Sequence, residues 1–381
     1  MLRNPYIEDT SLAGRKSEID GKLNRVREML QQHDAEALAL QMHPNFSWMT
    51  AGGKNFVANC FDAGATTLLI TKDECFAICN VIETPRLLQE EHLEELGFTV
   101  LSYPWQENRL EEYVKKHVSS LDKVVSDVPL GSAMVRNDWI KPLRLQLTKN
   151  EIARYGYLGD KLSQAIEAAL TAIRPGMTEF ELVGELSRQI WPYGIEQVMH
   201  LVSFDERANL FRHALPTGKK LEHNVIVSIN GRYKGLIVTT SRMAYIGEPS
   251  KEFVKQYNDC CEMESLTASK ARVGEDELTL YNTLRQAYID KGYPDMFDRH
   301  GQGGCQGYWP REYMVTPDCH HIIQKNQAYC FNPVVDGTKT EDSFIVTEDG
   351  PMLITRPIIF PKLEYEFNGV KFERPGLLIL N

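Results

Sequence analysis

The feature that most constrains this chain is a segment that occurs twice in similar form. RPGMTEFELVGELSRQIWPYG begins at Arg174, and RVGEDELTLYNTLRQAYIDKG begins at Arg272, 98 residues later. The copies share an arginine, a glycine, a glutamate, two leucines and a final glycine at equivalent places. Each copy lies between a longer helical pattern and a group of strand-like runs. The repetition predicts an α+β domain of two similar halves with a cleft between two antiparallel sheets, whereas a chance similarity between two amphipathic helices is the alternative.

Local patterns around the two copies indicate helices followed by strands. The run EIARYGYLGDKLSQAIEAALTAI places apolar residues at helical spacing, and Thr178 with Glu181 fits a capping box that predicts a helix from about 179 to 191. After the first copy we expect strands in HLVSF, NVIVSI and RYKGLIVTTSRMAYIG. After the second copy we expect them in HHIIQ, QAYCFNPVV, DSFIVTEDG and PMLIT. These elements assign residues 148–381 to one domain.

Residues 1–147 show a different arrangement. Apolar residues at helical spacing predict a helix over 18–31, and EALALQ at 36–41 predicts a strand. TTLLIT and ECFAIC predict a hairpin with Lys72 and Asp73 near its turn, and KVVSDVP predicts another short strand. This mixture is typical of a small α/β domain, and a length of 381 residues agrees with two domains.

The composition is that of a globular protein, and it narrows the possible partners. Hydrophobic residues make up 43% of the chain and the net charge is −10, so a nucleic acid, which requires a basic surface, is not an expected partner. The segment MLRNPYIEDTSLAGRKSEID is charged and lacks the apolar core of a signal peptide, and no apolar run approaches the roughly 18 residues that span a bilayer. We therefore expect a cytoplasmic protein with no membrane partner. The eight cysteines are scattered without a CxxC pair, which indicates reduced thiols.

The stretch RHGQGGCQGYWPRE at 299–312 raises three possibilities: phosphate binding, a metal site or proton transfer. It lacks the last glycine of GxGxxG and the GK[ST] of a P-loop, so phosphate binding is not expected. The glycines after His300 carry no side chains, which would let a ligand approach the backbone closely. Cys305 is expected to be a packed thiol rather than a nucleophile. Arg311 and Glu312 form either a surface ion pair or a clamp on a substrate carboxylate.

Other candidate residues lie before and after this stretch. His213 in LFRHALPTG is either a surface histidine or a general acid/base, because imidazole titrates near neutrality. Arg212 beside it either contacts an anionic group or is solvated. Ser228 and Thr239 lie eleven residues apart on successive predicted strands. The two acids of TEDSFIV should point to opposite faces of a strand, so only one of them faces a cleft.

Together, the duplicated half, the RPGMTE helix cap, HGQG followed by Pro310 and the late Glu-Asp pair resemble the creatinase, aminopeptidase P and prolidase family. The resemblance covers the whole second domain, and residues 1–147 also look like that family's N-terminal domain. It implies an α+β fold, in which a creatinase-like N-terminal α/β domain over 1–147 precedes a duplicated pita-bread catalytic domain over 148–381. A homodimer is a further expectation, because creatinase-like proteins are commonly dimers.

The metal-binding members of that family use two aspartates, one histidine and two glutamates as ligands. The resemblance matches the aspartates with Ser228 and Thr239, and it matches the glutamate of an E-P pair with Asn332. His300 and the last glutamate, Glu341, are retained. Serine, threonine and asparagine supply neutral oxygens, which are poor ligands for Mn, Co or Zn. The resemblance therefore implies no cofactor, with a weak single divalent metal on His300 and Glu341 as the alternative.

Creatinase shares this fold and hydrolyses a small guanidino compound without metal, with a histidine equivalent to His213 as its proposed general acid/base. The resemblance implies a metal-independent hydrolase that cleaves a C–N bond in a small amide- or amidine-like molecule. In this interpretation His213 moves the proton, while His300 and Glu341 orient substrate or water. The substrate-binding residues would be Arg311, Glu312, Tyr308, Asn332 and Arg212.

Two alternative functions stay open. The first is an Xaa-Pro aminopeptidase or dipeptidase, a metallopeptidase with a degenerate metal site. The second is a catalytically inactive pseudo-peptidase that binds peptides. The joint presence of His213, His300 and Glu341 favours an enzyme, because a binding module has no need of these groups.

Overall fold

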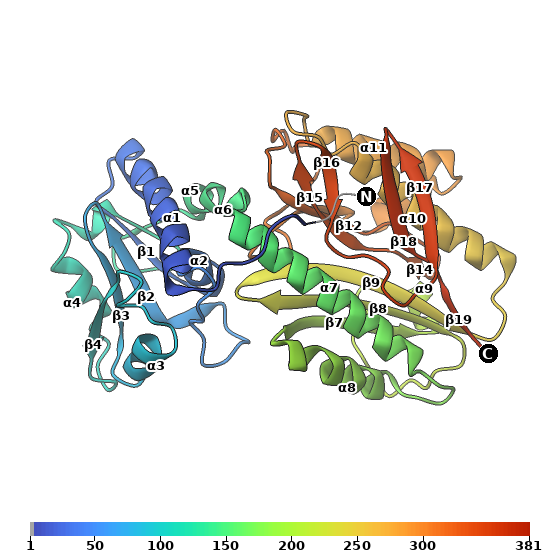
Figure 1. The fold of residues 1–381 in the computed structure, drawn as a ribbon, viewed down its shortest axis with the longest axis horizontal. Helices are drawn as coiled ribbons and strands as arrows, with labels where there is room; N and C mark the ends of the chain where they lie inside the picture. The colour runs from blue at the N-terminus through green and yellow to red at the C-terminus, as the bar shows by residue number, and fades with distance from the viewer. Residues whose placement is uncertain (1–3) are drawn as a thin grey trace. The chain divides into compact units, whose positions relative to one another are not determined.

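The computed structural model describes residues 4–381, and the chain separates into two compact units (Figure 1). The N-terminal unit comprises residues 7–150 with 234–236, and the C-terminal unit comprises mainly 151–233 and 237–381. Within the described residues, no helix is both long enough and apolar enough to cross a membrane. All eight cysteines are free thiols, and seven of them are buried.

The N-terminal unit is built on a six-stranded sheet in the order β4-β3-β2-β1-β5-β6. The predicted hairpin is present, because β2 and β3 pair antiparallel on either side of Lys72 and Asp73. Along α1, Ile19, Val26 and Leu30 are buried on one face, as their helical spacing requires. The strands are β1 (Ala37–Met42), β2 (Ala63–Thr71), β3 (Cys75–Asn80), β4 (Thr99–Tyr103), β5 (Val124–Ser126) and β6 (Met134–Val135). The helices are α1 (Leu12–Gln32), α2 (His43–Met49), α3 (Thr84–Gln89), α4 (Leu110–Lys115), α5 (Asn137–Ile140) and α6 (Pro142–Leu145).

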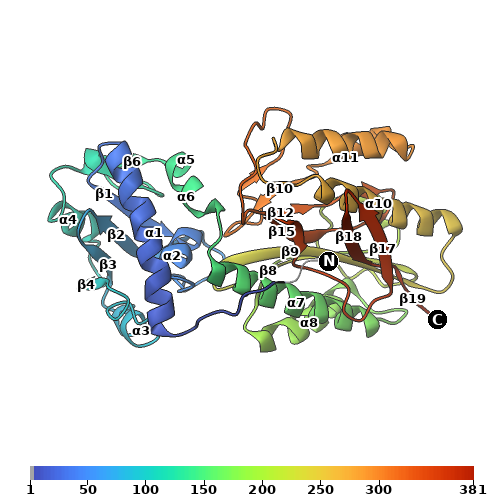
Figure 2. The same ribbon diagram turned by 45° about the horizontal axis from the view of Figure 1, so that its top comes forward.

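The first half of the C-terminal unit carries a four-stranded sheet in the order β19-β9-β8-β7. The predicted capping box is present, since the Thr178 hydroxyl accepts from the Glu181 backbone N–H and the Glu181 carboxylate accepts from the Thr178 backbone N–H. Helix α7 runs along this sheet (Figure 2), and its Leu162 packs tightly against Gly231 of β8, where an added Cβ would lie 3.0 Å from the Leu162 side chain. The elements are α7 (Lys149–Thr171), α8 (Glu179–Ile190), β7 (Glu196–Phe204), α9 (Arg207–Leu210), β8 (Asn224–Tyr233), β9 (Leu236–Ile246) and β19 (Leu378–Leu380).

The second half repeats this plan with a five-stranded sheet in the order β11-β10-β12-β15-β16. The strand predicted at HHIIQ is wrong, because these residues make only an isolated bridge between Ile322 and Asp276 in the turn before α11. The helices are α10 (Lys251–Ser269) and α11 (Leu278–Asp290). The strands of the sheet are β10 (Gly303–Gln306), β11 (Tyr313–Met314), β12 (Ala328–Phe331), β15 (Asp342–Thr347) and β16 (Gly350–Leu353). Two small hairpins complete it: β13 (Val334–Val335) with β14 (Thr338–Lys339), and β17 (Lys362–Phe367) with β18 (Val370–Pro375).

Equivalent backbone hydrogen bonds in the two halves support the predicted duplication. The Gly176 N–H donates to Leu221 O at 2.8 Å in the first half, and the Gly274 N–H donates to Ile323 O at 2.9 Å in the second. Both glycines have positive φ angles, +80° and +91°, which side-chain-bearing residues rarely adopt. In each half the glutamate three residues later is completely buried. The two copies therefore share a turn geometry as well as a sequence pattern.

A buried ionic network connects the two halves of the C-terminal unit. Arg242 of β9 contacts Glu167 of α7 at 3.1 Å and Asp342 of β15 at 2.8 Å. Arg374 of β18 contacts the other Asp342 oxygen at 3.0 Å and also pairs with Glu264 of α10. Burial raises the pKa of Glu264, which favours its protonated form and brings the two cations and the acids closer to charge balance.

We predict that Arg242→Ala strongly destabilises the C-terminal unit. The substitution leaves Glu167 and Asp342 buried without their shared cation, which costs about 3–5 kcal/mol in comparable cases. Urea denaturation followed by intrinsic fluorescence measures the loss. Arg188→Ala, which removes an exposed ion pair on α8, is the matched control and should cost under about 1 kcal/mol. Equal losses of stability in the two variants would contradict the role of Arg242 as the buried cation that connects the two halves.

Candidate active site

A lysine lies among the residues that the sequence identified as candidates. The Nζ atom of Lys339 is 2.9 Å from Ser228 Oγ and 2.9 Å from Glu341 Oε2. Ser241 Oγ is 2.7 Å from Ser228 Oγ and donates a hydrogen bond of 2.7 Å to Glu341 Oε2. All four side chains are buried, and we call them the Lys339 cluster. Strands β8, β9 and β14 position the cluster, together with the residues that lead into β15.

Sequence reasoning missed Lys339 and Ser241, although a signal for Lys339 was present. Lys339 lies two residues before Glu341 in extended chain, and residues at that spacing point to the same side. The expectation that Glu341 and Asp342 face opposite sides agrees with their contacts. Glu341 belongs to the Lys339 cluster, whereas Asp342 belongs to the network around Arg242.

Glu341 is held as a carboxylate by two cations. Burial alone would raise the pKa of Glu341, but Lys339 and Arg311 outweigh that effect and, with the Ser241 hydrogen bond, lower it to about 2. Arg311 Nη2 lies 3.0 Å from Glu341 Oε1, while Lys339 contacts the other oxygen. The carboxylate is therefore ionised at neutral pH and paired at both oxygens.

His300 is held as a neutral imidazole at the edge of this group. Its Nε2 atom lies 3.0 Å from Asn332 O, and its Nδ1 atom lies 3.4 Å from the side-chain nitrogen of Gln302. Burial lowers the pKa of His300 to about 4, and the positive charge of Lys339 contributes further. The ring thus serves as a donor to the backbone, with Nδ1 unprotonated. The Asn332 side-chain amide lies against the Gly301 and Gln302 carbonyls, and its nitrogen donates to both in the amide orientation that satisfies these surroundings.

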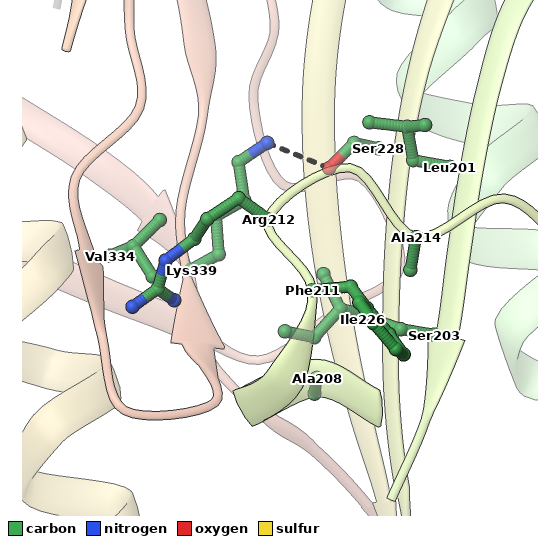
Figure 3. Close-up of a pocket in the computed structure, with 10 residues that line it drawn as sticks. All are labelled: Leu201, Ser203, Ala208, Phe211, Arg212, Ala214, Ile226, Ser228, Val334 and Lys339. Atoms are coloured by element: carbon green, nitrogen blue, oxygen red, sulfur yellow. Dashed lines mark hydrogen bonds between the residues drawn. The ribbon is translucent and has the colours of Figure 1, made fainter. Parts of the chain in front are cut away.

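A small cavity opens beside the Lys339 cluster (Figure 3). The space enclosed in it is small, about 20 Å³, which is room for about one water molecule. Its polar lining residues are Ser203, Arg212, Ser228 and Lys339. Its apolar lining residues are Leu201, Ala208, Phe211, Ala214, Ile226 and Val334. The Lys339–Ser228 hydrogen bond forms part of its wall.

The structure places His213 on an exposed segment next to this cavity. Its neighbours Arg212 and Ala214 both line the cavity, but His213 itself is not among the lining residues. The proton-transfer role of His213 stays a prediction.

Thr239, on β9, accepts a hydrogen bond of 2.7 Å from the Gln306 side chain and is buried.

The predicted substrate contacts of the Tyr-Trp-Pro-Arg-Glu segment also stay predictions, because the structure gives these side chains partners within the protein. Glu312 accepts hydrogen bonds from the backbone N–H groups of Tyr308 (3.0 Å) and Trp309 (3.3 Å). The Tyr308 hydroxyl donates to Glu151 at 2.7 Å, and both side chains are buried. Arg311 pairs with Glu341, as described above. These contacts fix the segment within the protein, and Arg311 connects it to the Lys339 cluster.

The expectation that the glycines after His300 admit a ligand to the backbone is wrong for β10. A Cβ atom at Gly303 would lie 2.3 Å from Cys330 O, and one at Gly304 would lie 2.2 Å from Tyr313 O. The space beside these glycines is filled by the neighbouring strands β12 and β11. Their lack of side chains permits close strand packing instead.

Comparison with known proteins agrees with this architecture. Residues 156–354, more than half of the chain, match metallopeptidase family M24, and the chain belongs to this family. An uncharacterized peptidase of Staphylococcus aureus strain USA300 is 25% identical over 226 residues, which cover 57% of this chain and 64% of that relative. The matched region thus spans less than two thirds of its length.

Solved structures share the fold at low sequence identity. The Xaa-Pro dipeptidase from Bacillus anthracis has a TM-score of 0.75 and 21% identity, covering 95% of this chain and 100% of that chain. X-Pro aminopeptidase from Thermotoga maritima has a TM-score of 0.73 and 18% identity, covering 94% and 99%. The N-terminal domain of FACT complex subunit SPT16 from chickpea has a TM-score of 0.66 and 13% identity, covering 89% and 97%. The expected α+β fold, with its N-terminal domain and pita-bread domain, is confirmed.

The divalent metal ions that the family name implies do not fit the residues present here. In the part of the chain that the structure describes, no three His, Cys, Asp or Glu side chains gather into a group suited to a metal ion. Ser228 and Glu341, two of the expected ligand positions, both contact the Lys339 ammonium instead. A cation between two ligand positions repels a second cation, and the remaining donors are neutral oxygens.

We predict that His300 stays neutral down to about pH 4. Its folded pKa of about 4 lies below the value of about 6.5 of an exposed imidazole, so the unfolded chain takes up a proton first as the pH falls. His300 should therefore cost no stability above about pH 6.5 and up to about 3 kcal/mol by about pH 4. NMR titration, with His300→Asn to assign the signal, measures the pKa. The variant should also show a flatter loss of stability over this range, and a midpoint near 6.5 would refute the prediction.

Proposed function

We propose that this chain is a hydrolase that cleaves a C–N bond in a small amide, and that the Lys339 ammonium, rather than a divalent metal ion, supplies the positive charge in its active site. The observation that carries the proposal is the position of Lys339 Nζ, 2.9 Å from both Ser228 Oγ and Glu341 Oε2. Lys339 also lines the cavity beside this cluster. Membership of a peptidase family supports hydrolysis as the reaction class.

The charges of the cavity favour an amide over the amidine that the sequence left open. Arg212 and Lys339 both line the cavity, and none of the described residues that line it is an Asp or Glu. A cationic amidinium or guanidinium group would be repelled by these two side chains. An amide carbonyl, in contrast, gains a hydrogen-bond donor and a positive charge close to its oxygen.

The reaction requires charge stabilisation and a proton acceptor. The oxygen of a water molecule bonds to the amide carbon, the C–N bond breaks, and a proton from the water passes to the nitrogen that leaves. Lys339, fixed by Glu341, would stabilise the negative charge that develops on the carbonyl oxygen. Glu341, with a pKa of about 2, is a poor proton acceptor at neutral pH. His213, in the segment that also contributes Arg212 to the cavity, is therefore our candidate base.

A second candidate function is hydrolysis of Xaa-Pro dipeptides. It is favoured by the structural similarity to proteins named Xaa-Pro dipeptidase and X-Pro aminopeptidase. A dipeptide also contains a single amide C–N bond and fits the same reaction scheme. The pseudo-peptidase alternative is favoured by the internal hydrogen bonds that already engage Ser228, Thr239 and Asn332.

We predict turnover of an amide by protein that has been treated with a chelator and contains well under one equivalent of Mn, Fe, Co or Zn. The substrate panel comprises N-acyl amino acids, proline dipeptides and guanidino acids, and metal content is measured by mass spectrometry. Lys339→Met should lower kcat about 100- to 1,000-fold, as loss of a charge-stabilising donor does. Lys339→Arg should retain more activity, and Lys325→Met, at an exposed ion pair, is the matched control.

The outcomes of this experiment separate the candidates. Near-stoichiometric tightly bound metal with metal-dependent cleavage of proline dipeptides would replace the proposal by a metallopeptidase. A lack of turnover across the panel, with or without added manganese, would favour the pseudo-peptidase. Circular dichroism of each variant checks that lost activity does not reflect lost folding.

A further inference from the structure

The cavity beside the Lys339 cluster is small, and its charged lining is entirely positive. Arg212 and Lys339 both line it, as Figure 3 shows, and none of the described lining residues is an Asp or Glu. The Arg212 Nη1 atom is buried and has no hydrogen-bond partner among the described residues. A buried polar atom without a partner is costly, and a charged one more so. The lining therefore favours an occupant that carries negative charge.

Glu341 does not neutralise the positive charge at this place. Its carboxylate carries one negative charge and pairs with two cations, Lys339 at 2.9 Å and Arg311 at 3.0 Å. The Lys339 ammonium has three N–H groups, and among the described residues it contacts two acceptors, Glu341 and Ser228. One N–H group is thus left for an occupant of the cavity, and one unit of positive charge remains.

Arg212 is not fully neutralised either. Burial and then the nearby Arg299 lower the pKa of Arg212, whereas Asp336 acts in the opposite direction. Asp336 itself lies 3.9 Å from Arg299, so its charge is shared between two arginines. Burial is the main cause of the lowered pKa of His300, and the positive charges of Lys339 and Arg212 both add to it. The two lining cations therefore act on the same small region.

We propose that this cavity binds a single halide ion, such as chloride, which contacts the Arg212 guanidinium and the Lys339 ammonium. The enclosed space is about 20 Å³, enough for about one water molecule, and a halide ion is close to water in size. Unlike water, a halide carries the negative charge that the two cations lack. Phosphate and carboxylates contain several heavy atoms and exceed this space.

The hydroxyl groups of the lining differ in what they offer an anion. Ser241 donates its hydrogen to Glu341 Oε2, so it is the acceptor in its 2.7 Å contact with Ser228. The Ser228 hydrogen is thus directed at Ser241, while its oxygen accepts from Lys339. Ser203 also lines the cavity, and its hydroxyl can donate to a halide. Two cations and one hydroxyl group therefore supply the donors of the site.

The test measures thermal unfolding of the full chain in sodium chloride and in sodium gluconate at equal ionic strength, because gluconate is too large for the cavity. Chloride that binds the folded chain raises Tm, and the dependence on its concentration gives a Kd. Arg212→Met should weaken chloride binding at least about tenfold, as loss of a charge-assisted hydrogen bond does, and Arg212→Lys should retain part of it. Arg188→Met, at an exposed ion pair on α8, is the matched control and should leave the Kd unchanged.

Crystals grown in sodium bromide locate the ion without any substitution, because bromide scatters anomalously. The expected result is an anomalous peak within hydrogen-bonding distance of Arg212 and Lys339. An adventitious ion only, with peaks confined to the outer surface, would overturn the proposal. An equal response of Tm to chloride in the unaltered chain and in Arg212→Met would overturn it as well.

Two further outcomes separate this site from its alternatives. Stabilisation by acetate equal to that by chloride would overturn the halide assignment, because the size of the cavity should exclude acetate. A halide contains no bond to cleave, so this site goes beyond the proposed hydrolase and does not depend on it. Chloride binding without turnover of any amide would refute only the hydrolase, whereas turnover without chloride binding would refute only this site.

Discussion

Two adjacent buried carboxylates, Glu341 and Asp342, impose the constraint on which the C-terminal unit depends. Neither can be ionised inside the protein without its own compensating cation, because burying an isolated charge is prohibitively costly. Asp342 is compensated by Arg242 and Arg374, and Glu341 by Lys339 and Arg311. These contacts tie strands from both halves to one short segment of chain.

The side chains around Asp342 and those around Glu341 lie in different surroundings. The network around Asp342 is enclosed and contributes to the stability and register of the packed halves. The Lys339 cluster borders a cavity that Ser228 and Lys339 line. Adjacent residues thus belong to different groups of side chains, because alternate residues of an extended chain point to opposite sides: Asp342 joins the enclosed network, and Glu341 joins the cluster to which we assign a chemical role.

Much of the fold could be predicted from the sequence, since it follows from local patterns. The Thr178–Glu181 capping box, the hairpin around Lys72 and Asp73, and the repeated arginine-glycine turn all depend on residues close together in the chain. The strand predicted at HHIIQ is wrong because its apolar pattern does not reveal that its backbone hydrogen bonds are made with the turn before α11.

Fewer features of the candidate site could be predicted from the sequence. Candidate positions such as Ser228, His300 and Glu341 follow from the family resemblance, but their partners come from distant segments. Lys339 meets Ser228 across 111 positions of the chain, and no local pattern reports such a contact. The prediction for the glycines of β10 is wrong for the same reason, because the strands that fill the space beside them are distant in sequence or follow a loop.

A lysine side chain differs from a metal ion in one respect that bears on how this protein would operate in a cell. Lys339 is covalently part of the chain, so its occupancy is complete whenever the protein is folded and does not vary with the supply of trace elements. Its single charge is carried by three N–H donors on a flexible stem, whereas a divalent ion carries two charges and is bound by several ligands at once. A protein that uses Lys339 in place of a divalent metal ion would thus not depend on metal supply, but its cation would support a narrower range of chemistry.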